Sequence, residues 1–320
     1  MTVLEAIQKS TDFLTKKGVE SPRLQTELLL AHLLKMPRMN LYLNFERALT
    51  PAETDALREC IRRRGRREPV QHITGSTSFC GLEMAVNRHA LIPRPETELL
   101  AEAGWRFLAE RRSPNRHDDE MPERAGSETG VPTALDFGTG TGCIAIALAV
   151  KCPNAKIVAV DVSGDALVLA GENATRNGVA GQIQFLAGDG LAALQNAGHA
   201  PGLSPSDETK SGTGGKSVPP FDLIISNPPY IPSAEIATLP PEVRDFDPRT
   251  ALDGGVDGLD FYRRLATEAQ SCLRPGGKMM LEFGDGQAGA IREIFESEKW
   301  IVEAVKEDYS HRPRIIIVRR

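Results

Sequence analysis

The chain has 320 residues, of which 41% are hydrophobic and 25% are charged, and its formal net charge is −5 at pH 7. This composition is typical of a soluble globular protein with one large or two ordinary domains, and the acidic total argues against a protein that coats nucleic acid. The five cysteines are scattered without a CxxC pair, which predicts reduced thiols in a cytoplasmic protein and argues against a disulfide framework or a zinc site. No apolar run approaches the roughly 18 residues of a membrane helix, and the charged N-terminus is unlike a signal peptide.

Residues 1–72 are predicted to form a small helical domain. Apolar residues recur at helical intervals over residues 2–17, and Ser21 before Pro22 predicts an N-cap for a second helix. The sequence Thr50-Pro51-Ala52-Glu53 has the pattern of a capping box and predicts a third helix to about residue 64. This domain is interpreted either as a substrate-recognition module or as a stability cap.

The predicted third helix ends in a cluster of arginines between Arg58 and Arg67. Residues 1–70 hold 13 Lys and Arg against 9 Asp and Glu, a net of +4, which leaves −9 for the remainder of the −5 total. One interpretation is a solvated last turn that the helix dipole favours. The other is a positive surface for an acidic or RNA-associated partner. The first is slightly favoured.

The middle of the chain is predicted to connect two domains. Residues 73–92 are typical of a hairpin linker, and the prolines of Leu91-Ile92-Pro93-Arg94-Pro95-Glu96-Thr97-Glu98 predict an extended segment before a helix to about Arg111. Residues 112–132 are polar and predicted to form a surface linker. Residues 195–220 are rich in Gly, Ser and Pro and predicted to be a disordered insert.

From Thr133 onward, apolar strands alternate with helices, which is the mark of a parallel α/β sheet. The predicted domain therefore covers residues 93–320. Its predicted strands are residues 133–137, 156–160, 183–186, 221–226, 277–283, 300–305 and 314–319.

A glycine-rich turn follows the first of these strands, with the sequence Gly138-Thr139-Gly140-Thr141-Gly142. Glycines let the backbone turn tightly and approach a ligand closely at the start of a helix. Asp161 ends the second strand, where an acidic side chain can bind ribose hydroxyls. The pattern after a strand-terminal acid resembles the S-adenosyl-L-methionine loop of class I methyltransferases, and Asp189 stands where that fold contacts the adenine.

A second loop follows the strand at 221–226, with the sequence Asn227-Pro228-Pro229-Tyr230. The prolines cannot donate backbone hydrogen bonds, so this loop is predicted to be stiff and to leave carbonyl oxygens free. Asn227 adds an acceptor and Tyr230 a flat face, a set that suits a planar NH2 group. A proline strand terminator with a buried tyrosine is the alternative for this motif alone.

With these motifs, the chain resembles the release factor glutamine methyltransferase family over nearly its whole length. Further matching segments are Glu68 to Gly75, Leu91 to Glu98, Gly254 to Asp260, Pro275 to Gly277 and Arg312 to Arg314. The resemblance implies a seven-stranded class I methyltransferase (Rossmann-like) domain, preceded by an all-helical domain and a β-hairpin. It implies S-adenosyl-L-methionine as cofactor, and methylation of the glutamine side-chain nitrogen in the Gly-Gly-Gln loop of peptide chain release factors.

The resemblance also implies roles for individual residues. Gly138 to Gly142, Asp161, Asp189, Gly190 and Asn227 are expected to contact the cofactor. Asn227, Pro228, Pro229 and Tyr230 are expected to hold the glutamine, and no metal is expected. Three features depart from the family. Gly190 replaces a frequent Trp, so that one wall of the adenine pocket must come from elsewhere. The insert at 195–220 exceeds the usual length, and His311 stands where a Gly is expected.

Three other functions are weighed. A sibling enzyme methylates a glutamine of a ribosomal protein, but the Arg94 to Glu98 segment favours the release-factor branch. The Asn-Pro-Pro-Tyr loop would also suit an N6-adenine methyltransferase. That enzyme needs a basic channel for nucleic acid, which the net charge of −9 in the second domain does not favour. A non-catalytic nucleotide-binding module would leave that loop without purpose. We therefore expect a release-factor substrate, with neither membrane nor direct nucleic-acid binding.

Overall fold

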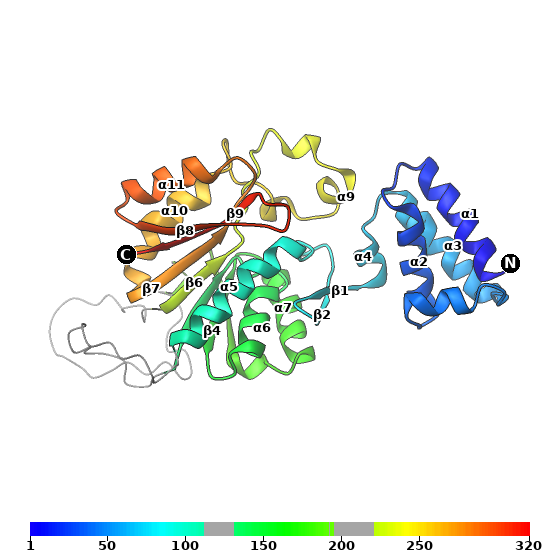
Figure 1. Cartoon of the computed structure of the whole chain (residues 1–320), viewed down its shortest axis with the longest axis horizontal. Helices are drawn as coiled ribbons and strands as arrows, with labels where there is room; N and C mark the ends of the chain where they lie inside the picture. The colour runs from blue at the N-terminus through cyan, green and yellow to red at the C-terminus, as the bar shows by residue number, and fades with distance from the viewer. Residues whose placement is uncertain (112–130, 192, 195–220) are drawn as a thin grey trace. The chain divides into compact units, whose positions relative to one another are not determined.

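The computed structural model describes residues 1–111, 131–191, 193–194 and 221–320 (Figure 1). The predicted insert at 195–220 and nearly all of the predicted linker at 112–132 lie outside the described residues. The chain divides into two compact units. The helical unit comprises residues 1–77, 86–88 and 238–247, and the sheet unit comprises residues 78–85, 89–237 and 248–320.

The helical unit is held together by the apolar faces of its helices. Its elements are α1 (Val3–Lys16), α2 (Pro22–Leu33), η1 (Arg38–Leu43), α3 (Pro51–Gly65), α4 (Val70–Thr74) and α9 (Pro241–Arg244). The core includes Val3, Ile7, Leu14, Leu29, Leu30, Leu57 and Ile61. The predicted capping box at Thr50 is confirmed, because Thr50 Oγ1 accepts from Glu53 N at 3.2 Å and Thr50 N donates to Glu53 Oε2 at 2.9 Å.

Ser21 occupies the predicted N-cap position of α2, but its side chain does not cap the helix. Ser21 has the left-handed backbone conformation, with φ 46° and ψ 50°, and its side chain makes no capping hydrogen bond. An N-cap residue needs an extended backbone to bring its side-chain oxygen to the first free N–H groups of the helix. Helix α2 nevertheless begins at Pro22, as predicted from the proline at its first position.

The arginine cluster at the end of α3 is largely paired with carboxylates. Arg62 pairs with Glu59 and Arg63 pairs with Glu68, each with 2.6 Å between the guanidinium nitrogen and the carboxylate oxygen. Arg64 is buried, and its Nη2 lies 2.6 Å from Glu242 Oε1 in α9. Arg67 binds the same carboxylate through two nitrogens, each at 2.7 Å. The last turn of α3 is thus in part a packing surface within the helical unit, rather than only a solvated helix end.

Strands β1 (Ser76–Phe79) and β2 (Leu82–Ala85) form the predicted hairpin. Its two-residue turn is Cys80-Gly81, with φ values of 52° and 76°. Positive φ at both turn positions is the conformation that matches the twist of a two-residue hairpin. Asn173 of helix α7 (Gly164–Arg176) then holds the second strand, accepting from Ala85 N at 2.7 Å and donating to Ala85 O at 3.0 Å.

The sheet unit contains one seven-stranded sheet with the order β5-β4-β3-β6-β7-β9-β8. Its strands are β3 (Thr133–Phe137), β4 (Lys156–Asp161), β5 (Ile183–Ala187), β6 (Phe221–Ser226), β7 (Leu273–Glu282), β8 (Ile301–Glu307) and β9 (Pro313–Arg319). All are parallel except β9, which pairs antiparallel with β7 and β8. All seven predicted strands are confirmed. β7 begins at Leu273 rather than at residue 277, with a register shift in its pairing to β6 before Leu223, and β9 begins one residue earlier than predicted, at Pro313.

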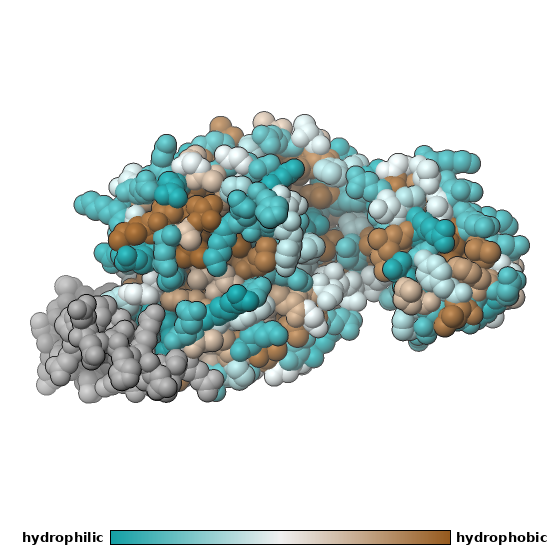
Figure 2. Space-filling model, viewed as in Figure 1, coloured by the Kyte–Doolittle hydropathy of each residue, from teal (hydrophilic) through white to brown (hydrophobic). Residues whose placement is uncertain are grey.

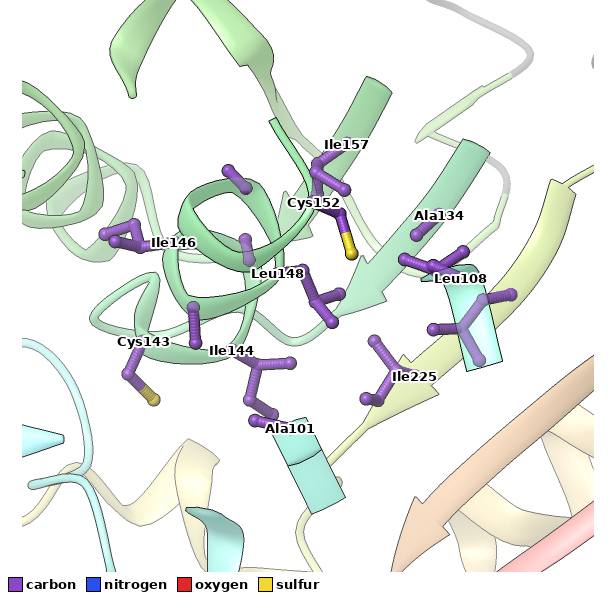
Figure 3. Packing of buried hydrophobic residues seen from close by; sticks show 14 of the residues in the cluster. Ala101, Leu108, Ala134, Cys143, Ile144, Ile146, Leu148, Cys152, Ile157 and Ile225 are labelled. Carbon is purple, nitrogen blue, oxygen red and sulfur yellow. The ribbon is translucent and has the colours of Figure 1, made fainter. Parts of the chain in front are cut away.

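Helices cover both faces of this sheet (Figure 1). Alternate strand residues point to opposite faces, and each face has its own apolar cluster. Figure 3 shows part of the cluster beneath α5 and α6, including Ile144, Leu148, Ile157 and Ile225. The helices are α5 (Pro95–Arg111), α6 (Cys143–Lys151), α7 (Gly164–Arg176), α10 (Asp260–Glu268) and α11 (Ala288–Ser297), with short turns η2 (Ala180–Gln182), η3 (Ile236–Thr238), η4 (Arg249–Ala251) and η5 (Ala269–Cys272).

The close approach of α5 to β6 depends on Gly104. A Cβ atom added there would lie 2.8 Å from Ile225 Cδ1 and 3.1 Å from Leu148 Cδ2, which is closer than packed carbon atoms tolerate. The middle of α5 therefore packs closely against β6. Within the described ranges, no helix has the length and apolar character that crossing a membrane requires.

Candidate active site

A cavity of about 540 Å³ opens at the carboxyl ends of β3, β4 and β6. Chain order reverses between β3 and β6, and ligands of open α/β sheets bind at such a switch point. The predicted residues that line it are Gly138, Thr139, Gly140, Thr141, Asp161, Asp189, Gly190, Asn227 and Pro229. Gly142, Pro228 and Tyr230 are not among the lining residues. Arg94, Thr97, Phe261 and the segment 248–251 also line the cavity, and sequence reasoning assigned them no place in it.

The glycine loop adopts backbone conformations that favour glycine at three positions. Gly138, Gly140 and Gly142 have φ values of 71°, 55° and 80°. A Cβ on Gly142 would lie 3.0 Å from Ala170 Cβ, so this glycine allows α6 to pack closely against α7. The first two glycines carry the backbone along the cavity wall, whereas Gly142 serves packing on the other side of the loop.

Asp136, at the end of β3, holds this loop in place. It is fully buried, and its Oδ2 accepts from Thr139 Oγ1 at 2.6 Å and from Ala145 N at 3.2 Å. Burial raises the pKa of Asp136 to about 7, although the hydrogen bond from Thr139 opposes the increase. The sequence marked this position as a strand-terminal acid, and the structure shows that it acts as a brace for the loop.

Asp161 lies on the cavity wall at the end of β4. Its Oδ2 accepts from Gly140 N at 2.8 Å, and its Oδ1 accepts from Ser163 N at 2.9 Å. Each carboxylate oxygen has a second lone pair, so both can still accept a ligand hydroxyl. Asp161 therefore joins the glycine loop to the place predicted for a ribose.

The space beside Gly190 is occupied by Arg264 of α10. A Cβ on Gly190 would lie 2.1 Å from Arg264 Nη2, and Gly190 has φ 68°. Arg264 pairs with Asp189 through Nη1 and donates to Asp189 O through Nη2 at 3.0 Å. Phe261, one turn earlier in α10, lines the cavity and packs edge-on against Phe137 with ring centroids 6.4 Å apart. Arg264 and Phe261 are therefore candidates for the wall of the adenine pocket that the sequence left unassigned.

The Asn227–Tyr230 loop is fixed on several sides. Ser226 Oγ donates to Phe137 O at 2.6 Å, and Asn227 Nδ2 donates to Thr97 Oγ1 at 3.1 Å. The ring of Tyr230 packs against the apolar cluster beneath α10 and α11, and burial raises its pKa to about 12. Its backbone oxygen accepts from Gln287 Nε2 at 2.9 Å.

Glycines of the matched 254–258 segment let this loop lie against neighbouring backbone. A Cβ on Gly254 would be 2.8 Å from Pro229 O, and one on Gly258 would be 2.3 Å from Tyr230 O. Side chains at either position would therefore displace the loop. The segment has a structural role that its sequence alone did not reveal.

Comparisons with known proteins first define the class. Residues 132–312 match the family model described as a methyltransferase domain. Together with the glycine loop and the seven-stranded sheet, this match shows a class I methyltransferase fold, and the enzyme uses S-adenosyl-L-methionine as its cofactor. Residues 5–75 match the PrmC N-terminal domain.

Full-length relatives then define the family. The "Release factor glutamine methyltransferase" of Geobacter sulfurreducens is 40% identical over 92% of this chain and 88% of its own. The proteins of the same name from Chlorobaculum tepidum and Moorella thermoacetica are 39% and 36% identical, over 97% and 100% of this chain and 94% and 99% of their own. The chain belongs to the release factor glutamine methyltransferase family, which confirms the resemblance read from its motifs.

Proposed function

We propose that this enzyme methylates the side-chain nitrogen of the glutamine in the Gly-Gly-Gln loop of peptide chain release factors, and that Asn227 to Tyr230 hold that glutamine. The observation that carries the proposal is the orientation of Asn227. Its Nδ2 is engaged by Thr97, while the residue itself lines the cavity. The side-chain Oδ1 is then the atom available to accept a hydrogen from a substrate amide.

The task of the protein in this reaction is positioning. An amide nitrogen is a weak nucleophile because its lone pair is delocalised into the carbonyl group. Bound S-adenosyl-L-methionine supplies an already activated methyl group. Asn227 Oδ1 and a backbone carbonyl of the Pro228-Pro229 step would each accept one hydrogen of the substrate amide. These two hydrogen bonds would fix the plane of the amide and hold its nitrogen in line with the methyl group of the cofactor. The nitrogen loses its proton readily once methylated, so no strong base is needed beforehand.

The cavity also fits the cofactor. Its volume lies within the range of small-molecule sites. Gly138 to Thr141 offer close backbone approach, and Asp161 offers acceptors for ribose hydroxyls. We assign the adenine to the end of the cavity with Asp189 and Gly190, where Phe261 provides an aromatic wall and the guanidinium of Arg264 lies beside Gly190.

The helical unit is proposed to recognise the release factor. It exposes large apolar side chains, which Figure 2 shows among hydrophilic ones on this unit. They include Leu24, Leu28, Met39 and Leu43, the last 85% exposed. Exposed side chains of this kind would supply apolar contact area to a protein partner.

Two further expectations belong to the proposal: a cytoplasmic location, and a protein rather than a nucleic acid as substrate. The same loop would also suit an adenine amino group. The pairing of Arg62, Arg63, Arg64 and Arg67 with carboxylates weakens the basic surface that a nucleic-acid substrate would require. The protein substrate is therefore the better supported of the two.

The test is single-turnover methyl transfer to a release factor by variants of Asn227. Asn227→Ala removes one preorganised contact, and we expect the rate to fall on the order of 10²–10³-fold. Asn227→Asp keeps an acceptor and the shape, so it should retain more activity than Ala. Tyr230→Phe should be mild, because the ring rather than the hydroxyl is packed. Circular dichroism checks folding. Transfer by Asn227→Ala at close to the wild-type rate would show that the glutamine is not held here.

A further inference from the structure

Glu282 is a buried carboxyl group next to the active site that the proposed reaction has not yet used. It is the last residue of β7, where its neighbour Leu281 pairs with Ser226 of β6. The residue is 2% exposed. Its Oε2 has no hydrogen-bond partner within the part of the chain that the structure describes. Leaving a polar atom of this kind unpaired in a core costs free energy, which calls for an explanation.

The carboxyl group of Glu282 faces the two residues that fix the substrate loop. The strand register places Glu282 beside Asn227, because Leu281 pairs with Ser226. Asn227 Nδ2 donates to Thr97 Oγ1 at 3.1 Å, and hydrogen bonding from Thr97 and Asn227 opposes the rise that burial causes in the pKa of Glu282. Thr97 is 3% exposed and sits in the first turn of α5. The three side chains thus form one buried cluster that ends at the cavity wall.

The charge of Glu282 decides which way this cluster is oriented. An ionised carboxylate can only accept hydrogen bonds, so the Thr97 hydroxyl and an N–H of Asn227 must both donate to it. The oxygen of Thr97 must then accept, and only the nitrogen of the Asn227 amide can donate to it. The carboxylate therefore holds Nδ2 inward and leaves Oδ1 for the cavity. A protonated Glu282 could donate, and the reversed amide would then also be satisfied.

We propose that Glu282 is a positioning residue that acts through Thr97 to orient the amide of Asn227, so that an acceptor rather than a donor meets the substrate nitrogen. This inference rests on the proposed role of Asn227. It adds a specificity device to that role, because an amide presented the other way would meet the NH2 group with a second donor.

The pKa of Glu282 lies in a pH range that a rate measurement can cover. Burial raises its pKa to about 7, against the hydrogen bonds from Thr97 and Asn227 and the charge of Arg314. The charged and titratable groups around it are Arg314 of β9, Glu96 of α5, Tyr230 after β6 and Tyr262 of α10. Arg314 donates to Phe283 O at 3.0 Å and pairs with Asp308 at 3.4 Å. Raising the pH through 7 ionises Glu282, so the orienting form gains population with pH.

The experiment measures single-turnover methyl transfer to a release factor at saturating substrate, as a function of pH. Glu282→Gln should lower the rate by about 10- to 100-fold, the scale of a small misplacement of reacting groups. The wild-type rate should rise with pH near 7 as Glu282 ionises, and the Glu282→Gln variant should lack this rise. The affinity for S-adenosyl-L-methionine, measured by calorimetry, should stay within about twofold, since the defect lies in orientation rather than in cofactor binding. Exposed Glu293→Gln on α11 is the matched control and should behave as wild type.

Variants of Thr97 test the same chain of contacts if Glu282→Gln does not fold. Thr97→Val removes the hydroxyl at constant shape and should match the loss seen in Glu282→Gln, whereas Thr97→Ser should stay near wild type. The double variant Thr97→Val/Glu282→Gln should be no slower than either single variant. Wild-type rate and pH profile in Glu282→Gln or in Thr97→Val, or effects that multiply in the double variant, would overturn the proposal.

Asn227→Ala separates this inference from the function on which it rests. If Asn227→Ala transfers normally, the proposed glutamine site itself is wrong. If Asn227→Ala is inactive while Glu282→Gln is fully active, the site stands and only the orienting role of Glu282 fails.

Discussion

Asp161 braces the backbone of the cavity wall, and we propose that the same side chain also binds the cofactor. It was expected to bind ribose because it follows the second strand, and the structure adds that it holds Gly140 N and Ser163 N. Its charge lies where two backbone N–H groups already favour an anion. The carboxylate is therefore preorganised before a ribose arrives.

Asp161→Ala should weaken binding of S-adenosyl-L-methionine by about 1–3 kcal/mol, because charge-assisted hydrogen bonds to the ribose are lost. Part of the loss will come from the glycine loop, which loses its contact at Gly140. Calorimetric titration measures the affinity, and exposed Asp165→Ala in the first turn of α7 is the control. An unchanged affinity in folded Asp161→Ala would remove Asp161 from the cofactor site.

The residues found from the sequence and those missed differ in a physical way. Asn227 and Asp161 were predictable because each follows a strand, and carboxyl ends of parallel strands meet at one edge. Thr97 was visible only as part of a matched motif, since its partner Asn227 lies 130 positions away. Glu282 carried one signal, a charged residue ending the apolar run Met279-Met280-Leu281, but no local rule says what such a residue faces.

At the scale of elements, the short helix α9 follows the Asn227–Tyr230 loop in the sequence. Ten residues lie between Tyr230 and α9, yet α9 belongs to the helical unit, where Glu242 binds both Arg64 and Arg67. Burial alone would raise the pKa of Glu242, but hydrogen bonds from Arg67 and Arg64 outweigh it and lower the pKa to about 2. The sequence could not show this contact, because 178 positions separate Arg64 from Glu242.

Glu242→Gln should destabilise the helical unit at pH 7 by about 1–3 kcal/mol, since buried Arg64 loses its counter-charge. Because the folded pKa lies below the ordinary value of 4.5, the contribution is complete above pH 4.5 and is lost as the pH falls toward 2. Hydrogen exchange of α2 and α3 amides measures the effect. Glu59→Gln, in an exposed pair with Arg62, should change little. Equal protection in Glu242→Gln and wild type at pH 7 would contradict the assignment.

At the scale of the whole molecule, the fold was predictable because its signals are local and repeated. Seven short apolar strands separated by helices specify a parallel sheet, and all seven were confirmed with small differences at their ends. Periodicity does not report backbone conformation at single residues. The left-handed backbone of Ser21, whose side chain does not cap α2, was therefore not foreseen, and neither was the φ of 59° at His311, where the resemblance led us to expect Gly.

Substrate identity was less accessible than fold. Composition and spacing favoured a planar NH2 group, which glutamine and adenine share, and only family membership points to glutamine. The cavity, the inward Nδ2 of Asn227 and the paired arginines of α3 fit a protein amide. The central claim is that the substrate is a glutamine side chain rather than an adenine.

The most direct measurement of that claim is mass-spectrometric mapping of the product. The enzyme is incubated with S-adenosyl-L-methionine and a release factor, in parallel with a release factor carrying Gln→Ala in its Gly-Gly-Gln loop and with an adenine-containing DNA. We predict a peptide one methyl group heavier, with the methyl on the glutamine side chain, and no methylation of either other substrate. Methylation of the DNA, or of the Gln→Ala release factor to the same extent, would contradict the proposed function.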